Sequence, residues 1–470
     1  MYILRLCAAI GALLGSTALV YAAPTSPEDA FRRRQAGVPL PASDSFYTPP
    51  AGYQNTAPGT VLKSRPIAAG ILGVIPDPVF AWQLLYRSTA VNGSAIATVT
   101  TVFKPLVAKT DRFISYATAY DSSATQCDPS YSYRLGSNPT TNVETEAELL
   151  VIQGLLLQGY IVSSPDYEGP DAAFAPGHLE GMCVLDSMRA VTNFGSTIGF
   201  TTKTPAIVGV GYSGGAIATG WAASLAPSYA PELPVKGWAQ GGTPANLTAV
   251  TNKIDDTEWS GFLPTAVAGL LAPSAYKAQL QSLFDTILTA KGKAAIQYAQ
   301  TNCFESVLLK YAFVSVLSTD FQTLGPAILY EPTVQQVFAD NTMGVTQSET
   351  PKAPVLVYHA TPDEIIPYLD ASELVDRWCS RGASVQFSTY TKGGHLTTLI
   401  VAIPEVFDFV NSAFAGTVAA GCSTKSYFTN TLDPVGLAVE LEPIIANLVL
   451  LLGRAITADA SNSPAAFVGQ

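Results

Sequence analysis

The sequence predicts an α/β fold with a mostly parallel, doubly wound sheet and an inserted helical segment. Three features support this prediction. Apolar runs with the length of buried strands alternate with helical periodicity from Phe113 onward. A Gly-x-Ser-x-Gly pentapeptide occupies residues 211–215, between an expected strand and an expected helix. The alternation stops at about Asn246, and strands return only at Val355.

The expected elements follow one another in an order typical of parallel sheets. Short β-forming runs at 81–86 and 95–103, separated by Gly and Pro, predict an antiparallel start. The chain then predicts, in order, strand 113–117, helix 144–158, strand 161–164, helix 183–194 and strand 206–210. Because a β-α-β-α order gives parallel strands, we expect the functional loops at the carboxyl edge of the sheet.

A long helical insertion follows a further expected strand at 235–239. Residues 246–342 show mainly helical periodicity, at 274–288, 294–301 and 304–317. Such an insertion between two core strands predicts a cap or lid domain on a core formed by residues 66–245 and 343–430. The alternative is a helical decoration without a gating role, because the position of an insertion does not by itself demonstrate movement.

Composition excludes two classes of protein. Hydrophobic residues make up 48% of the chain and charged residues 13%, which predicts a large core with an exposed apolar face and excludes disorder for the bulk. The formal net charge is −11, and the only cluster of basic residues is Arg32–Arg34. Nothing in the sequence would attract a phosphate backbone, so nucleic-acid binding is not expected.

Both ends of the chain have a distinctive composition. Residues 1–23 combine one arginine, an apolar stretch and small residues before Pro24, which is typical of a secretory signal peptide and too short to favour a transmembrane anchor. Residues 24–34 end in three arginines and are interpreted as a trimmed pro-segment or as a merely flexible N-terminus. Residues 431–470 contain an apolar run too short to span a bilayer, interpreted as a C-terminal tail or flap. We therefore expect a secreted, extracellular protein.

Secretion favours disulfide bonds among the cysteines. Cys7 leaves with the signal peptide, so five cysteines remain and at least one is unpaired. Cys183 lies on an expected helix and is interpreted as a buried free thiol. Without Cys-x-x-Cys spacing and with three histidines, no metal site is expected. Glycosylation sequons begin at Asn92 and Asn246.

The pentapeptide at 211–215 predicts a nucleophile elbow. A tight turn between strand and helix lifts the Oγ of Ser213 clear of the sheet, and Gly211 and Gly215 leave room for the two elements to approach. A Gly- and Ala-rich chain can produce this pattern by chance, but the strand-turn-helix context favours Ser213 as a nucleophile.

A serine nucleophile needs a base, and the base needs an orienting acid. His395 follows the expected strand 385–390 through two glycines and is the predicted base on a loop at the sheet edge. Asp363, after the expected strand 355–358, is the predicted acid. Weaker alternatives for the acid are Glu364, Asp370 and Asp376. The chain order Ser, Asp, His is that of the α/β hydrolases.

The other two histidines do not fit the base. His178 lies upstream of Ser213, out of the hydrolase order, and is interpreted as a loop residue. His359 directly extends an expected strand and is interpreted as a structural histidine. For the oxyanion hole, one donor is expected from the backbone N–H of Gly214 and the other from Asp121, in the Tyr-Asp-Ser that follows an early strand.

Five motifs together resemble the fungal secretory lipase family typified by Candida antarctica lipase A: Gly211–Gly215, Tyr120–Ser122, Ser164–Gly169, Pro362–Pro367 and Gly393–His395. The resemblance implies an α/β-hydrolase fold with a helical lid and ester hydrolysis without a cofactor. It implies a triad of Ser213, Asp363 and His395, and an oxyanion hole of Asp121 and Gly214. It also implies the disulfides Cys127–Cys303 and Cys379–Cys422, which leave Cys183 free. The matching segment Asp166–Glu168 is interpreted as loop architecture.

We therefore expect a secreted serine-dependent carboxylic-ester hydrolase, with a triacylglycerol at a lipid–water interface as its substrate. The net acidity disfavours anionic membranes and leaves neutral lipid or small esters. A short-chain esterase, or a deacetylase of acylated small metabolites, would use the same mechanism and is the main alternative. A serine peptidase would need a charged cluster that binds a peptide terminus, and none stands out in this sequence. A purely binding protein would have no chemical use for the triad.

Overall fold

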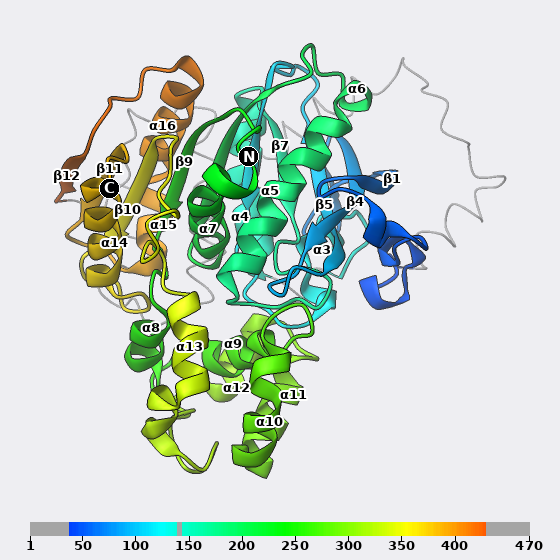
Figure 1. Ribbon diagram of the computed structural model, residues 1–470. Helices are drawn as coiled ribbons and strands as arrows, with labels where there is room; N and C mark the ends of the chain where they lie inside the picture. Colours follow the sequence, from blue (N-terminus) through cyan, green and yellow to red (C-terminus); the bar gives the residue numbers. More distant parts are fainter. Residues whose placement is uncertain (1–36, 139–142, 429–470) are drawn as a thin grey trace, which may run out of the picture. The chain divides into compact units, whose positions relative to one another are not determined.

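The computed structural model describes residues 37–138 and 143–428 (Figure 1). The predicted signal peptide (1–23), pro-segment (24–34) and C-terminal tail (431–470) lie outside the described residues. From Val38 onward, the described residues belong to one compact unit.

A sheet of ten strands crosses the core (Figure 1). Its spatial order is β1 (Val61–Ile67), β4 (Phe80–Thr89), β5 (Ala95–Lys104), β7 (Ile161–Pro165), β6 (Arg112–Ala117), β8 (Ala206–Tyr212), β9 (Val235–Gly241), β10 (Val355–Ala360), β11 (Val385–Tyr390) and β12 (Ser423–Tyr427). The pairs β1–β4, β4–β5 and β5–β7 are antiparallel, and every later pair is parallel. A separate short hairpin joins β2 (Gly70–Ile71) and β3 (Ile75–Pro76). The antiparallel start and the parallel remainder confirm the predicted fold class.

Helices cover both faces of this sheet. One hydrophobic cluster combines α5 (Gly177–Asn193), α7 (Gly214–Tyr229) and α14 (Tyr368–Ser380), and the other combines α4 (Val143–Leu157), α15 (His395–Val401) and α16 (Ile403–Ala415). Strands β7 and β10 are buried along their whole length, as strands of a parallel sheet covered on both faces are. The other helical segments outside the insertion are short: η1 (Pro41–Ser43), η2 (Ser45–Tyr47), η3 (Tyr53–Asn55), η4 (Thr125–Cys127), α3 (Pro129–Ser132) and α6 (Gly195–Ile198).

Helix α5 begins at Gly177, earlier than the predicted start at residue 183. Glycines at 177 and 181 weaken the helical signal in the sequence. In the structure they allow α5 to pack closely on α7, because a Cβ at Gly177 would lie 1.9 Å from Trp221 Nε1 and one at Gly181 would lie 2.8 Å from the Trp221 side chain. The glycines therefore serve tertiary packing at the expense of local propensity.

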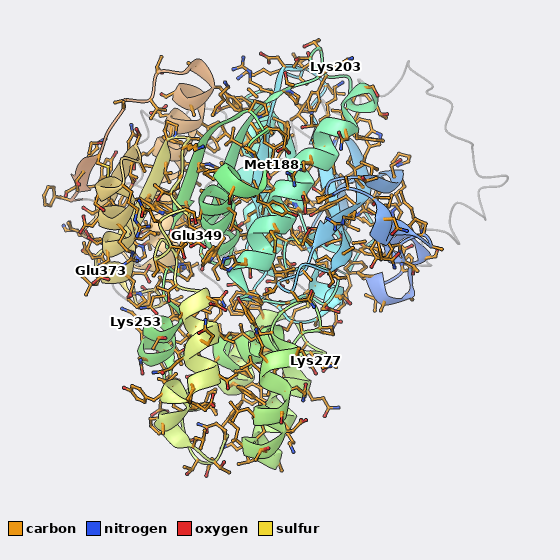
Figure 2. All side chains as sticks on the ribbon, viewed as in Figure 1. Met188, Lys203, Lys253, Lys277, Glu349 and Glu373 are labelled. Carbon is orange, nitrogen blue, oxygen red and sulfur yellow. A yellow bond between two sulfur atoms is a disulfide. The ribbon has the colours of Figure 1, made fainter. Side chains whose placement is uncertain are left out.

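The insertion between β9 and β10 is helical and lies below the sheet in the view of Figure 1. It contains α8 (Leu247–Ile254), α9 (Phe262–Leu270), α10 (Lys277–Ile287), α11 (Ala290–Ala299), α12 (Phe304–Tyr311), η5 (Gly325–Tyr330) and α13 (Pro332–Asp340). Charged side chains of these helices, such as Lys253 and Lys277, point outward, whereas Met188 of α5 is buried (Figure 2).

The helix predicted to reach residue 317 ends at Tyr311. The carboxylate of Asp255 accepts hydrogen bonds from Ser315 Oγ at 2.5 Å and from the backbone N–H of Val316 at 2.7 Å. A side chain that binds backbone N–H groups competes with helix formation, so this segment follows an irregular path. No single helix of the described chain is long and apolar enough to cross a membrane. Within the same residues, only α15 and α16 taken together reach the length and apolar composition of a membrane span, and they are bent by 52° at the break between them.

Candidate active site

Ser213 occupies a strained turn between β8 and α7. Its backbone has φ 52° and ψ −120°, a conformation that non-glycine residues rarely adopt. A Cβ at Gly211 would lie 2.2 Å from the carbonyl oxygen of Gly215, and one at Gly215 would lie 2.0 Å from the carbonyl oxygen of Ala117. Both glycines are therefore needed for the strand and the helix to approach this closely.

Three side chains from distant parts of the sequence form one hydrogen-bonded chain. His395 Nε2 lies 2.8 Å from Ser213 Oγ, and His395 Nδ1 lies 2.7 Å from Asp363 Oδ2. All three residues are buried. In this arrangement Nδ1–H donates to the carboxylate, which leaves Nε2 free to accept the hydroxyl proton of Ser213.

The carboxylate of Asp363 is held by the turn that follows β10. Its Oδ1 accepts hydrogen bonds from the backbone N–H groups of Ile365 at 2.9 Å and Ile366 at 2.7 Å. Burial would raise the pKa of Asp363, but the charge of His395 and the hydrogen bonds from His359 and His395 outweigh burial and lower it well below its usual range. The group is therefore a carboxylate throughout the neutral range.

The alternative acids make other contacts. Glu364 Oε2 accepts from the backbone N–H of His395 at 2.8 Å, and Asp370 Oδ1 accepts from Asn246 Nδ2 at 2.9 Å. Asp376 lies on α14. Within the described chain none of the three carboxylates hydrogen-bonds to the ring of His395, so the geometry favours Asp363.

His395 is the first residue of α15 and not a residue of an open loop. Thr397 Oγ1 accepts from the backbone N–H of Gly394 at 2.6 Å, which caps this helix directly before His395. Burial alone would lower the pKa of His395, but the charge of Asp363 and its hydrogen bond, with Glu364 and Asp121 adding to them, raise it above the ordinary value.

Asp121 and Gly214 lie beside the nucleophile. A Cβ at Gly214 would lie 1.7 Å from Asp121 Oδ1, so the aspartate side chain packs directly on the first residue of α7. The N–H of Gly214 belongs to the first helical turn, where N–H groups have no intrahelical partner. Asp121 has a positive φ of 39°, and burial raises the pKa of its carboxyl to about 7.

One cavity joins the nucleophile to the helical insertion. Its lining includes Ser213, Asp121 and Gly214 at one end. The insertion contributes side chains of α8, α9, α10, η5 and α13, among them Leu263, Val267, Leu280, Phe284, Leu329, Val337 and Phe338. Apart from Asp121, Ser213 and Thr251, the side chains that line the cavity are apolar. The site can therefore exclude water from a long apolar group whose reacting end lies at Ser213.

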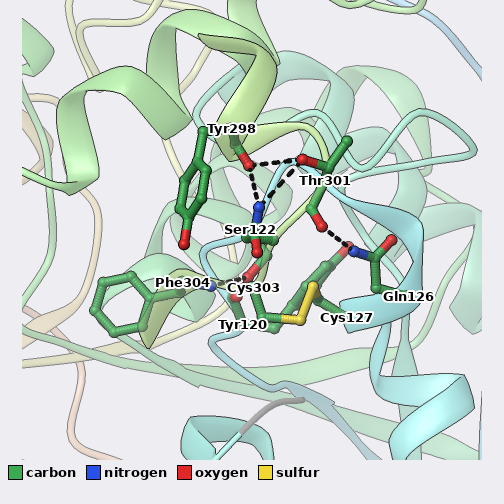
Figure 3. The surroundings of a disulfide bond; sticks show 9 residues. Tyr120, Ser122, Gln126, Cys127, Tyr298, Thr301, Cys303 and Phe304 are labelled. Atoms are coloured by element: carbon green, nitrogen blue, oxygen red, sulfur yellow. Dashed lines mark hydrogen bonds between the residues drawn. A yellow bond between two sulfur atoms is a disulfide. The ribbon is translucent and has the colours of Figure 1, made fainter. Parts of the chain in front are cut away.

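The structure contains the two disulfides that the family resemblance implies. Cys127 is bonded to Cys303 and Cys379 to Cys422, and Cys183 is a buried free thiol. Figure 3 shows the first of them, which joins the loop after β6 to the residue before α12. In the described part of the chain, no group of three or more His, Cys, Asp or Glu side chains could hold a metal ion.

The two sequons differ in their surroundings. Asn92 is exposed on the turn between β4 and β5. Asn246 caps α8: its Oδ1 accepts from the N–H groups of Thr248 and Ala249, and its Nδ2 donates to Asp370. Both polar atoms of the Asn246 side chain are therefore already in use.

Some contacts of the site were not expected from the sequence. His359 Nε2 lies 3.2 Å from Asp363 Oδ2, although His359 was interpreted only as a structural residue. The hydroxyl of Tyr212 donates to the carbonyl oxygen of His395. The only feature of the sequence that could have indicated the contact between His359 and Asp363 is their spacing of four residues across the end of an expected strand. His178, interpreted as a loop residue, is the second residue of α5, and its Nε2 lies 3.4 Å from Glu349 Oε1.

A mostly parallel sheet that carries a Ser-His-Asp chain at its carboxyl edge defines an α/β hydrolase. The chain belongs to the secretory lipase family, whose model matches residues 134–421.

Named relatives extend over most of the chain. It is 39% identical over 420 residues to the secreted triacylglycerol lipase LIP1 of Malassezia furfur, covering 88% of this chain and 84% of that protein. It is 36% identical to the secreted triacylglycerol lipase LIP4 of Malassezia globosa, and the match covers 89% of this chain and 91% of that protein. Like these relatives, the protein is extracellular.

Solved structures agree with this assignment. Candida antarctica lipase A in its closed state has a TM-score of 0.79 at 31% identity and covers 88% of this chain and 96% of that one. A mutant of the rice cell wall degrading esterase LipA from Xanthomonas oryzae has a TM-score of 0.58 at 14% identity. The match covers 75% of this chain and 100% of that one. At that identity the likeness concerns the fold alone.

Proposed function

We propose that this protein is a triacylglycerol lipase that cleaves carboxylic esters through an acyl-enzyme. The observation that carries the proposal is the hydrogen-bonded chain Ser213–His395–Asp363 at the end of an apolar cavity. The named relatives, which are triacylglycerol lipases at 36–39% identity, support the same substrate class.

In the first half-reaction Ser213 Oγ attacks the ester carbonyl carbon while His395 Nε2 takes the hydroxyl proton. The backbone N–H groups of Gly214 and Asp121 hold the developing oxyanion. His395 then gives its proton to the glycerol oxygen, and the alcohol leaves. Asp363 keeps Nδ1 protonated and stabilises the imidazolium between these two transfers.

In the second half-reaction a water molecule attacks the acyl carbonyl and His395 takes its proton. The tetrahedral intermediate collapses, Ser213 recovers its proton from His395, and the fatty acid leaves. Every step uses side chains or backbone groups of this chain, and the proposal includes no metal or cofactor.

The insertion is proposed to form the acyl-binding lid and not merely a decoration. Its helices supply most of the cavity wall that faces the nucleophile. Each buried methylene of an acyl chain contributes about 0.8 kcal/mol to binding. A wall of this kind therefore favours medium and long acyl chains over acetyl.

The outer surface of the insertion fits a neutral lipid surface. Leu309, Phe313 and Tyr330 are 83%, 67% and 74% exposed. Residues 311–319 and 321–330 contain no charged side chain. Exposed apolar side chains on a protein of net charge −11 suit an oil–water interface better than an anionic membrane.

The test is the rate of hydrolysis of p-nitrophenyl esters from acetyl to palmitoyl, with the long esters as an emulsion and Ser213→Ala beside the wild type. The proposal expects a preference for medium to long chains and an inactive variant. A strong preference for acetyl would identify a short-chain esterase or deacetylase with the same triad. Hydrolysis by Ser213→Ala would reject the mechanism.

A further inference from the structure

A second histidine contacts the proposed catalytic aspartate. His359 is the fifth residue of β10, which lies between β9 and β11 in the sheet. Its side chain has no exposed surface. The strand ends at Ala360, and the chain turns back so that Asp363 faces His359 four residues later.

Both histidines approach the same oxygen. His395 Nδ1 lies 2.7 Å from Asp363 Oδ2, and His359 Nε2 lies 3.2 Å from it. His359 Nε2 is also 3.3 Å from the carbonyl oxygen of Ile366. A carboxylate and a carbonyl can only accept, so the hydrogen of His359 must be on Nε2.

The other ring nitrogen supports this tautomer. His359 Nδ1 is buried and has no hydrogen-bond partner in the described part of the chain. An unpaired donor N–H in the interior would be costly, so Nδ1 carries no hydrogen. The ring of Tyr368 packs edge-on against the imidazole, at 5.9 Å between the ring centres, and fixes its plane.

With His359 included, both oxygens of Asp363 have more than one polar neighbour. Its Oδ1 accepts from two backbone N–H groups, and its Oδ2 accepts from Nδ1–H of His395. The Nε2–H of His359 is shared between Oδ2 at 3.2 Å and the carbonyl oxygen of Ile366 at 3.3 Å. His359 therefore stabilises the charged form of the acid and takes part of the hydrogen-bonding capacity of the oxygen that binds His395. This second effect sets how strongly Asp363 holds the imidazolium during turnover.

We propose that His359 is a positioning residue of the triad, which orients the carboxylate of Asp363 by donating from Nε2 to Oδ2 and so tunes the basicity of His395. The proposal rests on the function proposed above. It requires no proton transfer by His359, because His359 does not line the cavity and makes no hydrogen bond to Ser213.

The basicity of His395 depends on every group that faces it. In the described chain these groups are the hydroxyl of Ser213, Asp363 and Glu364 from the loop after β10, Asp121 from the loop after β6, and the ring of Tyr212 from β8. A change at His359 leaves the chemical identity of these groups unchanged. It alters the orientation of the Asp363 carboxylate and how much of the hydrogen-bonding capacity of Oδ2 is available to His395, so its effect on the pH profile can be separated from theirs.

Two variants at this position distinguish hydrogen bonding from packing. His359→Leu keeps an apolar side chain in the space but removes the donor. His359→Gln keeps a donor, since its Nε2 can occupy the place of the ring nitrogen. His178→Leu, at the histidine outside the triad, is the matched control, and Ser213→Ala tests the proposed function separately.

The measurement is kcat, KM and the pH dependence of kcat/KM with a soluble p-nitrophenyl butyrate, with thermal unfolding of each variant. His359→Leu is expected to lose about 10- to 100-fold in kcat at unchanged KM, because the carboxylate of Asp363 is no longer held in the orientation that His395 needs during proton transfer. Its acid limb should move to higher pH, because Asp363 then binds the imidazolium more strongly. His359→Gln should recover kcat to within about threefold of the wild type.

Two results would overturn the proposal. The first is a folded His359→Leu with the wild-type kcat and acid limb. The second is a folded His359→Gln as slow as His359→Leu, which would mean that packing alone matters. Either result, together with an inactive Ser213→Ala, leaves the proposed lipase mechanism intact. Activity in Ser213→Ala would instead reject that mechanism, whatever His359 does.

Discussion

Ser122 Oγ accepts a hydrogen bond from the backbone N–H of Phe304 at 2.9 Å (Figure 3). The residue next to Asp121 is thereby bound to the first residue of α12. The disulfide Cys127–Cys303 joins the same two segments. The loop of the proposed oxyanion hole and the helical insertion are thus connected both covalently and by hydrogen bonding.

Removal of this disulfide should therefore impair catalysis as well as stability. The double variant Cys127→Ser with Cys303→Ser is expected to lose about 2–4 kcal/mol of unfolding free energy. It should also lose about tenfold or more in kcat, because the N–H of Asp121 is no longer held in place. Denaturant unfolding and ester hydrolysis measure the two effects.

The second disulfide is the control. Cys379→Ser with Cys422→Ser opens the bond between α14 and the residue before β12. This variant should lose stability and keep kcat. Equal losses of kcat in both double variants would contradict a specific link between the insertion and the oxyanion hole.

Gly214→Ala should nearly abolish activity. The new Cβ would meet Asp121 Oδ1 at 1.7 Å, so the aspartate or the start of α7 must move. Loss of one oxyanion donor typically lowers kcat by about 10² to 10³. Ala216→Gly, in the same helical turn, should cost about 1 kcal/mol of stability and leave kcat unchanged. An active Gly214→Ala variant would argue against this oxyanion hole.

Glu364→Gln should move the acid limb of kcat/KM to lower pH. Glu364 Oε2 accepts from the N–H of His395, and its charge raises the pKa of that histidine. The neutral amide keeps an acceptor but removes the charge, so His395 loses its proton at a lower pH. The shift is opposite to the one expected for His359→Leu. An upward shift would show that the charge of Glu364 does not act on His395.

Asp166→Asn should stabilise the fold above pH 7. Asp166 is buried and accepts from the N–H and Oγ of Ser130, and burial raises the pKa of its carboxyl to about 7. A folded pKa above the unfolded value means that stability falls as pH rises from about 4 to about 7. The amide does not titrate, so the variant should gain at least about 1 kcal/mol over the wild type at pH 8 and none at pH 4.

Thermal unfolding at the two pH values measures the gain from Asp166→Asn. The exposed carboxylate of Asp111, which pairs with Arg112, provides a control. Asp111→Asn should change stability by less than about 1 kcal/mol at either pH. A gain from Asp166→Asn that is equal at both pH values would show that Asp166 is ionised throughout.

Glycosylation is expected at Asn92 and not at Asn246. Asn92 is exposed on a turn, whereas the amide of Asn246 caps α8 and binds Asp370. In material from a secreting eukaryotic host, Asn92→Gln should lower the mass by one glycan and Asn246→Gln should not. A glycan recovered on Asn246 would contradict this expectation.

The sequence was sufficient to predict the elements with the strongest local signals. The parallel strands around Ser213 are continuous apolar runs, and the elbow needs small residues at fixed positions, so both could be inferred locally. The residues proposed for the triad could be selected because their chain order and their positions after strands leave few choices. The start of α5 was misplaced, because its glycines are explained only by Trp221 of another helix.

Contacts that depend on the path of the chain after each element could not be predicted in this way. The approach of His359 to Asp363 depends on how the chain turns after β10, and the bond between Ser122 and Phe304 joins residues 182 positions apart. The end of α12 is decided by Asp255, in a different segment. Each of these features depends on a side chain that satisfies backbone or charged groups elsewhere in the fold.

The most direct test of the central claim is peptide mapping after reaction with two fluorophosphonates, one with an ethyl chain and one with a hexadecyl chain. The account predicts a single label on Ser213, faster labelling by the long chain, and no label in His395→Ala. A label on another residue, or no label on a folded protein, would contradict the assignment of Ser213 as the nucleophile in an acyl-binding cavity.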